Sequence, residues 1–209
     1  MINAALELAA NGWAVFPCRS TCPSAKAPMT KNGHLNASTD PDKIKTWWTQ
    51  WPYAMIGAKV PNTSLLIDID PRNGGSLSAL EALTEPLPAT LTAWSGRNDG
   101  GRHLYFLRPV GLLTSTRLPQ GIDLKINGYC IVPPSIHPVA GQPYRWEPHP
   151  VAPLPIRLRE LLRPAPRAVR PLVAMTGMAP AWCVRSRERW KAQGTRSCIG
   201  RRAAPSKTD

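Results

Sequence analysis

Proline is the feature that most restricts the fold of this chain. Twenty-four of its 209 residues are proline, and they recur along the whole length. A proline inside a helix removes a backbone hydrogen bond and clashes with the preceding turn, so such a chain is divided into many short elements. The apolar fraction of 43% is still sufficient for a hydrophobic core. The sequence therefore predicts a domain of short helices and strands joined by loops.

Four segments have the pattern of short helices: residues 2–10, 41–51, about 76–84 and 156–163. The first places apolar side chains at helical spacing and ends at Asn11-Gly12. The second begins at a capping Thr39 or Asp40 with a proline in its first turn, and Pro52 ends it.

Strand patterns alternate with these helices. They are the runs "WAVFP", "SLLIDID", the two flanks of the glycine-rich loop 96–101, the segments on either side of Asn127-Gly128, and "QPYRWEP". The glycine-rich loop and the Asn-Gly pair are typical of hairpin connections, so each predicts a hairpin. Helices and strands together predict an α+β domain over residues 1–162.

Two aspartates stand in the run "SLLIDIDPRNGG" of residues 64–75. A strand turns residues i and i+2 to one face, so the carboxylates of Asp68 and Asp70 would point the same way. Like charges this close repel unless a positive group lies between them. Two interpretations remain open from this stretch alone: a turn in which both acids bind nearby backbone, or a metal site.

Other polar residues follow the same arrangement on later strands. His103 opens a strand directly after Gly100-Gly101, and Asp123 and Lys125 stand two apart on another. Carboxylates from separate strands can converge on Mg²⁺ or Mn²⁺, which prefer oxygen ligands. Two such ions can align a 3′-hydroxyl with a nucleotide α-phosphate, and amides of a glycine loop suit a triphosphate.

An ordered set of motifs over residues 10–147 resembles the N-terminal catalytic domain of the bifunctional DNA primase/polymerase (prim-pol) family, within the archaeo-eukaryotic primase superfamily. The motifs are "GWAVFP", "KAP", Gly33, "TDPDKIKTWW", "IGA", "LLIDIDPRNGG", "SGRNDGGRHLYFLRP" and "GIDLKINGYCIVPPSIHPVAGQPYRWE". The resemblance implies a core related to the RNA-recognition motif (RRM), packed against a smaller N-terminal α/β unit.

The resemblance also implies roles for individual residues. Asp68, Asp70 and Asp123 would be the metal ligands, and His103 would act with them in catalysis. The residues expected to bind the nucleotide are Gly100, Gly101, His103, Lys125, Ser135 and His137. The implied reaction is template-directed nucleotidyl transfer on a DNA template and primer with dNTPs or NTPs, using Mg²⁺ or Mn²⁺, expected as two ions. Members occur on plasmids, phages and other mobile elements, and a separate helicase is a further candidate partner.

Charge separates the body from the C-terminal end. Residues 1–156 carry 13 Lys/Arg and 10 Asp/Glu, whereas residues 157–209 carry 13 and 3. A basic end of this kind is typical of a polyanion partner or of a solvated terminus. We expect residues 163–209 to form a Pro/Arg-rich basic tail, either disordered or the remnant of a truncation.

Cysteine spacing and hydropathy limit the remaining classes. The five cysteines are Cys18, Cys22, Cys130, Cys183 and Cys198, and only "CRSTC" places two close together, so zinc is not expected. No apolar run approaches the roughly 20 residues that span a bilayer, and the N-terminus lacks signal-peptide features. The sequence favours a cytoplasmic protein with no membrane partner.

Two other functions remain open at this stage. Nothing in the chain resembles a nucleotide-triphosphatase P-loop, and the C-terminal end is irregular. A catalytically weak or truncated DNA-binding replication module is therefore the main alternative. A metal-dependent nuclease that uses the same carboxylates is the less favoured one.

Overall fold

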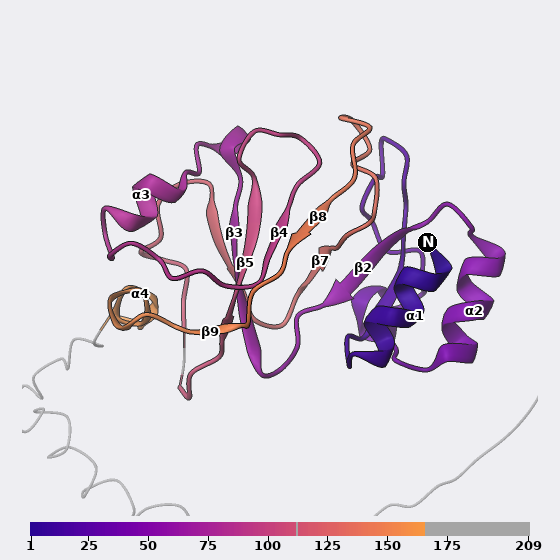
Figure 1. The fold of residues 1–209 in the computed structure, drawn as a ribbon, viewed down its shortest axis with the longest axis horizontal. Coiled ribbons are helices and arrows are strands. Elements are labelled where there is room, and N and C mark those ends of the chain that lie inside the picture. Colours follow the sequence, from indigo (N-terminus) through magenta and orange to yellow (C-terminus); the bar gives the residue numbers. More distant parts are fainter. Residues whose placement is uncertain (112, 166–209) are drawn as a thin grey trace, which may run out of the picture. The chain divides into compact units, whose positions relative to one another are not determined.

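A computed structural model describes residues 1–111 and 113–165 of the chain, and they form two mainly antiparallel sheets with four α-helices (Figure 1). The α+β class expected from the sequence is thereby confirmed. The predicted basic tail lies outside the described residues except for its first three. None of the helices in the described part of the chain has the length and apolarity needed to cross a membrane.

The smaller sheet has the strand order β1-β2-β7 and carries two helices. Its elements are α1 (Ile2–Ala10), β1 (Val15–Cys18), the short 3-10 helix η1 (Gly33–Asn36), α2 (Pro41–Gln50), β2 (Met55–Lys59) and β7 (Tyr129–Ile131). Asp40 caps α2 by accepting a hydrogen bond from the amide of Asp42, with Pro41 in the first turn, as predicted. Ala5, Ile44 and Trp48 bury the helices against this sheet.

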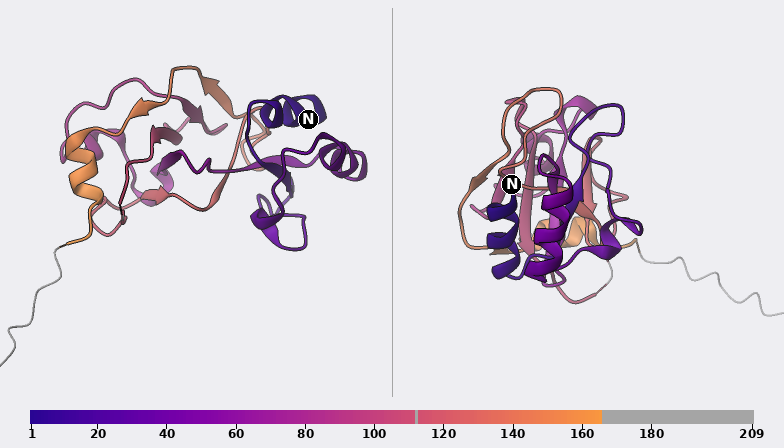
Figure 2. Two further views of the ribbon diagram at one scale, coloured as in Figure 1. Left: turned by 90° about the horizontal axis from the view of Figure 1, so that it is seen from below. Right: turned by 90° about the vertical axis from the view of Figure 1, so that its right-hand side faces the viewer.

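The larger sheet has the order β6-β3-β5-β4-β8, and β9 runs parallel to β5. Its elements are β3 (Ser64–Ile69), the 3-10 turn η2 (Pro71–Asn73), α3 (Leu77–Glu81), β4 (Thr92–Trp94), β5 (Arg102–Leu107), β6 (Ile122–Lys125), β8 (Arg145–Glu147), β9 (Ala152–Pro153) and α4 (Ile156–Leu162). Leu80 of α3 and Leu158 of α4 cover one face by packing on the cluster of Leu65, Ile67 and Ile69. Figure 2 shows the same arrangement from two further sides.

The opposite face of the larger sheet turns toward the smaller unit. Leu66 and Tyr105 belong to the same buried cluster as α1, α2 and β2. Since side chains alternate along a strand, Asp68 shares the face of Leu66. One face of β3 is thus fully covered by apolar side chains. Its other face is apolar at Leu66 and polar at Asp68, near the end of the strand.

One predicted hairpin is wrong. The glycine-rich loop does join the antiparallel neighbours β4 and β5, but Asn127-Gly128 does not join paired strands. β6 pairs with β3 in the larger sheet, whereas β7 pairs with β2 in the smaller one. Cys130 and Ile131 bury against the smaller unit, so the chain passes from one sheet to the other at this point. The Asn-Gly pair therefore marks a crossing between sheets.

Candidate active site

Three of the predicted site residues lie side by side across the larger sheet. Asp68 on β3 stands opposite His103 on β5 and opposite Asp123 on β6. Directly opposed residues of antiparallel strands share a face, so these three side chains form one row. Lys125 Nζ lies 2.5 Å from Asp68 Oδ2, and His103 Nε2 lies 3.5 Å from Asp68 Oδ1. The strand register thus makes Asp68 the centre of the group.

Asp70 lies just beyond the strand, where it caps η2. Its carboxylate accepts hydrogen bonds from the backbone and guanidinium of Arg72, from Asn73 and, at 3.0 Å, from Arg97. Partial burial alone would raise the pKa of Asp70, but the hydrogen bonds and charges of Arg72 and Arg97 outweigh it and lower the pKa. The turn interpretation of the sequence therefore describes Asp70, while Asp68 faces basic side chains.

The glycine-rich loop holds a largely covered arginine that the sequence did not single out. The Arg97 side chain is only 14% exposed, and it bridges Asp70 and Asp99. Its Nη1 atom is buried without a hydrogen-bond partner among the described residues. The amide of Gly101 donates to Asp99, and Gly100 adopts a positive φ of 87°. The two glycines thus shape the loop that positions Arg97.

His137 presents a free donor next to this loop. Its Nδ1 accepts from the amides of Val139 and Ala140, so in the neutral ring Nε2 carries the proton. That Nε2 is buried with no partner in the described part of the chain. Ser135, by contrast, is fully buried and accepts from the amide of Ile56 at 2.8 Å. The structure thus brings His137 toward the basic groups and uses Ser135 to attach its loop to β2.

A cavity of about 460 Å³ opens beside the Asp68 row. Its lining comprises Lys26, His34, Asp68, His103, Lys125, Gly128, Tyr129, Cys130, Ile131 and Tyr144. Lys26 adopts a positive φ of 70°, a strained conformation that is typical of functional positions. Burial lowers the pKa of Lys26, as do the charges of Arg97 and Arg72. Two basic side chains of the lining, Lys26 and Lys125, therefore share the cavity with Asp68, and the positive charges of Arg97 and Arg72 act on Lys26.

Lys26 and Arg97 are site residues that sequence reasoning missed. Both stand in motifs that carried the family resemblance, "KAP" and "SGRNDGG". Arg97 pairs with Asp70, and Lys26 lines the cavity together with Asp68, each from a loop distant in the sequence. Their position within these motifs is the one feature of the sequence that could have identified them.

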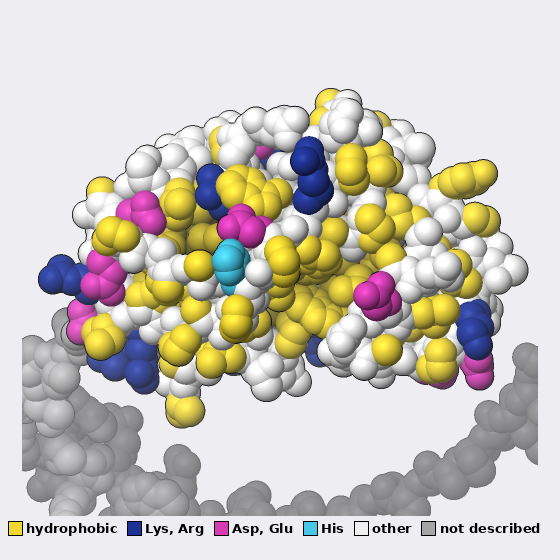
Figure 3. All heavy atoms as spheres, viewed as in Figure 1, with side chains coloured by type: hydrophobic (Ala, Val, Ile, Leu, Met, Phe, Trp, Pro, Cys, Tyr) yellow, Lys and Arg dark blue, Asp and Glu magenta, His cyan; other side chains and the backbone are white. Residues whose placement is uncertain are grey.

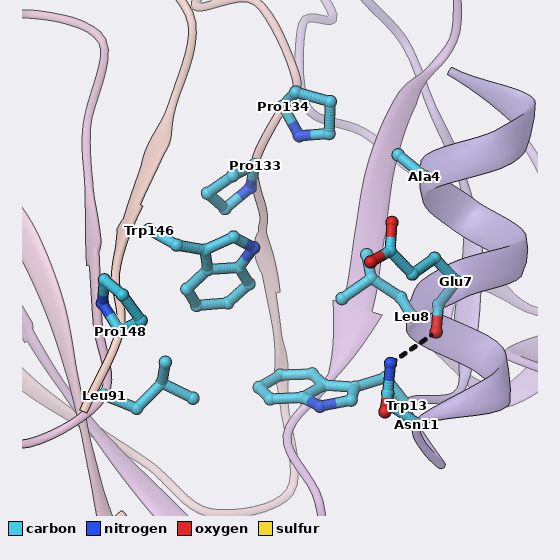
Figure 4. Close-up of a pocket in the computed structure, with 10 residues that line it drawn as sticks. All are labelled: Ala4, Glu7, Leu8, Asn11, Trp13, Leu91, Pro133, Pro134, Trp146 and Pro148. Atoms are coloured by element: carbon cyan, nitrogen blue, oxygen red, sulfur yellow. Dashed lines mark hydrogen bonds between the residues drawn. The ribbon is translucent and has the colours of Figure 1, made fainter. Parts of the chain in front are cut away.

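A second cavity of about 450 Å³ has a different character. It lies between α1 and the segments that carry Pro133 and Trp146 (Figure 4). Glu7 is the one ionisable residue in its lining. Figure 3 shows hydrophobic side chains gathered in a hollow on this face, with few Lys or Arg around it. A polyanion such as a triphosphate is therefore suited to the cavity of Lys26 and not to this one.

The carboxylates suit a divalent cation by chemistry. Oxygen ligands are those that Mg²⁺ and Mn²⁺ prefer, and Asp68 and Asp123 share one row. Within the described residues, however, no group of three or more His, Cys, Asp or Glu side chains could hold a metal ion as it stands. The carboxylate of Asp68 forms an ion pair with Lys125, and the carboxylate of Asp70 forms ion pairs with Arg72 and Arg97. A metal ion that bound these carboxylates would therefore compete with the basic side chains for the same oxygens.

Acidification is expected to destabilise the fold through His137. Burial, followed by the charges of Lys26, Arg97 and Arg72, lowers its pKa from 6.5 to about 4. Between pH 6.5 and 4 the unfolded chain therefore binds a proton that the folded chain does not, so the free energy of unfolding falls as pH falls. Protonation at Nδ1 would also break both backbone hydrogen bonds.

The matched variant for this prediction is His137→Asn, whose amide oxygen can accept from the same two backbone amides. We expect a weaker loss of Tm between pH 6.5 and 4 in the variant than in the wild type, measured by thermal unfolding. Equal pH dependence in the two proteins would contradict the assignment.

Comparison with known proteins identifies the family of the chain. The chain matches the family model described as bifunctional DNA primase/polymerase, N-terminal, over residues 5–157. No curated protein matches the chain. The matched segment contains β3, β5 and β6, and so includes the whole row of Asp68, His103 and Asp123. The family acts as DNA primase and polymerase, which implies nucleotide and DNA substrates. Since the match covers most of its length, the chain belongs to the bifunctional DNA primase/polymerase family, whose N-terminal domain it contains.

Proposed function

We propose that the chain catalyses metal-dependent, template-directed nucleotidyl transfer, synthesising and extending primers on DNA. One observation carries the proposal: a row of carboxylates lies beside a cavity whose other charged groups are basic. Acids beside basic groups suit a reaction in which a triphosphate is held while a hydroxyl attacks its α-phosphate. The proposed setting is the replication of a mobile element, phage or plasmid, as the sequence resemblance implies.

Asp68, Asp70 and Asp123 are the proposed ligands of Mg²⁺ or Mn²⁺. A bound divalent ion would neutralise charge on the phosphates and favour ionisation of the attacking hydroxyl. Arrival of the triphosphate gives Lys125, Arg72 and Arg97 new anionic partners, so they can release the carboxylate oxygens. The ion pairs of the structure thus hold the carboxylates in place before substrate binds.

The triphosphate itself is assigned to Lys26, Arg97, His103, Lys125 and His137. Buried Arg97 Nη1 and His137 Nε2 are donors that have no partner among the described residues, and a phosphate oxygen would satisfy each. His103 Nδ1 is equally without a described partner. Burial lowers the pKa of His103 to about 4, so the ring is neutral at physiological pH. Binding of an anion beside it would favour its protonation.

We also propose that the larger sheet is an RRM-like core. The order β6-β3-β5-β4, with α3 between β3 and β4, supports this relation. In a β-α-β-β-α-β fold the first and third strands are central, as β3 and β5 are here. The described residues between β5 and β6 form no helix, and α4 covers the sheet instead. The catalytic domain would then comprise residues 1–162.

Primer extension tests the function directly. The purified chain is incubated with a primed DNA template, Mg²⁺ or Mn²⁺, and dNTPs or NTPs, and product length is followed on a gel. Longer products that depend on the template support the proposal. DNA binding without extension would favour a replication module that lacks catalysis, and shortened substrate would favour a nuclease.

Substitution of Lys26 is expected to weaken nucleotide binding. A hydrogen bond to a charged group contributes about 1.5–3 kcal/mol, so Lys26→Ala should raise the KM for dNTP by about tenfold or more. Lys31→Ala removes an exposed lysine from the same region and serves as the control. Steady-state extension kinetics would measure both. An unchanged KM in Lys26→Ala would remove Lys26 from the phosphate site.

A further inference from the structure

The lining of the cavity beside Asp68 combines two kinds of side chain. Lys26, Asp68 and Lys125 are charged, whereas His34, Tyr129 and Tyr144 are aromatic. A nucleotide has the same two parts, a charged triphosphate and a flat base. If the basic side chains hold the triphosphate, the aromatic side chains are the surface that remains for the base.

Two aromatic rings lie stacked on this wall and come from distant segments. The rings of His34, from η1, and Tyr129, from β7, have centroids 5.7 Å apart and planes inclined by 26°. Both residues line the cavity, and both are partly exposed. Neither belongs to the buried part of a hydrophobic cluster. The pair thus presents aromatic surface to a ligand.

Packing on a buried ring and a hydrogen bond to Lys26 fix the position of the pair. The ring of Phe16, which is fully buried, meets Tyr129 edge to face with centroids 5.1 Å apart. The Tyr129 hydroxyl donates a hydrogen bond to the backbone carbonyl of Lys26 at 3.3 Å. An aromatic surface held rigidly next to a phosphate-binding lysine is preorganised for a ligand that carries both a ring and a phosphate.

We propose that His34 and Tyr129 form the stacking surface for the base of the incoming nucleotide, an inference that rests on the proposed function. Every base has a π-face, so stacking binds purines and pyrimidines alike and leaves the choice of base to the template. The crossing of the chain between the sheets at Gly128 is what brings Tyr129 to the cavity. The base site is thus built by the smaller unit and the phosphate site largely by the larger sheet.

Two probes separate the base site from the phosphate site. Dissociation constants for dATP and for inorganic tripolyphosphate, which has no base, are measured by calorimetry in the presence of Mg²⁺. We expect Tyr129→Ala and His34→Ala each to weaken dATP binding by about tenfold, the size of one lost stacking contact, and to leave tripolyphosphate binding unchanged.

The control is Tyr53→Ala, which removes an aromatic side chain that is 86% exposed and does not line the cavity, and it should bind dATP like the wild type. Tyr129→Phe keeps the ring and removes only the hydroxyl, so it separates the loss of stacking from the loss of the hydrogen bond to Lys26. Thermal unfolding checks that each variant is folded. If Tyr129→Ala weakened the binding of both probes equally, or did not weaken dATP binding, the proposed stacking surface would be overturned but the proposed function would stand. A wild-type protein that binds neither probe would overturn the proposed function as well.

Discussion

Replacing Asp68 by alanine is expected to reduce primer extension by about a hundredfold or more, because electrostatic stabilisation of a phosphoryl transition state by a bound metal contributes several kcal/mol. Asp68 is central in its row and contacts Lys125 and His103. Its removal would take away a proposed metal ligand and leave Lys125 without its carboxylate partner. Single-turnover extension with saturating dNTP measures the loss in the chemical step.

Two further variants sharpen this test. Asp68→Asn keeps the size of the side chain but removes its charge, and we expect it to be as inactive as Asp68→Ala. Asp42→Ala removes an aspartate on α2 that pairs only with exposed Lys45 among the described residues, and it should retain full activity. Extension by Asp68→Ala at the wild-type rate would exclude the carboxylate row as the catalytic centre.

Much of this row could be predicted from local sequence pattern. The apolar alternation around Asp68 identifies a strand, and strands with polar residues at their ends recur at His103 and Asp123. The glycine-rich loop correctly predicts that β4 and β5 are neighbours, since a short connection joins antiparallel strands. Local periodicity is enough to identify each strand and the polar residues at its end.

Pairing between strands is not a local property, and there the sequence was less informative. Asn127-Gly128 is the strongest short hairpin signal, yet the burial of Cys130 with the smaller unit decides where β7 pairs. Lys26 and Arg97 reach the site from loops, so no periodicity marks them. A cluster of charges assembled from separate segments becomes visible only when the strands are placed.

Gly75 illustrates the same point on the scale of one methyl group. In the sequence the pair Gly74-Gly75 simply turns the chain after the strand. In the structure a Cβ on Gly75 would lie 2.1 Å from the carbonyl oxygen of Gly121 and 3.0 Å from the amide of Asp70. That oxygen accepts the hydrogen bond of the Asp70 amide at 2.8 Å. Gly75 thus allows the end of β3 and the start of β6 to approach.

Gly75→Ala is therefore expected to destabilise the domain and distort its site together. The clash is with backbone, which cannot move aside as a flexible side chain would, so we expect a loss of roughly 1–3 kcal/mol. That corresponds to a Tm lower by about 3–10 °C for a domain of this size. Gly128→Ala, where an added Cβ meets nothing within 4 Å, is the control for stability and should have a Tm close to that of the wild type.

Because the clash also separates Asp70 from the strand that carries Asp123, the activity that remains at low temperature should fall as well. A Gly75→Ala protein as stable and active as the wild type would mean that the two strand ends can part without consequence, and that their close approach does not hold the carboxylates in place.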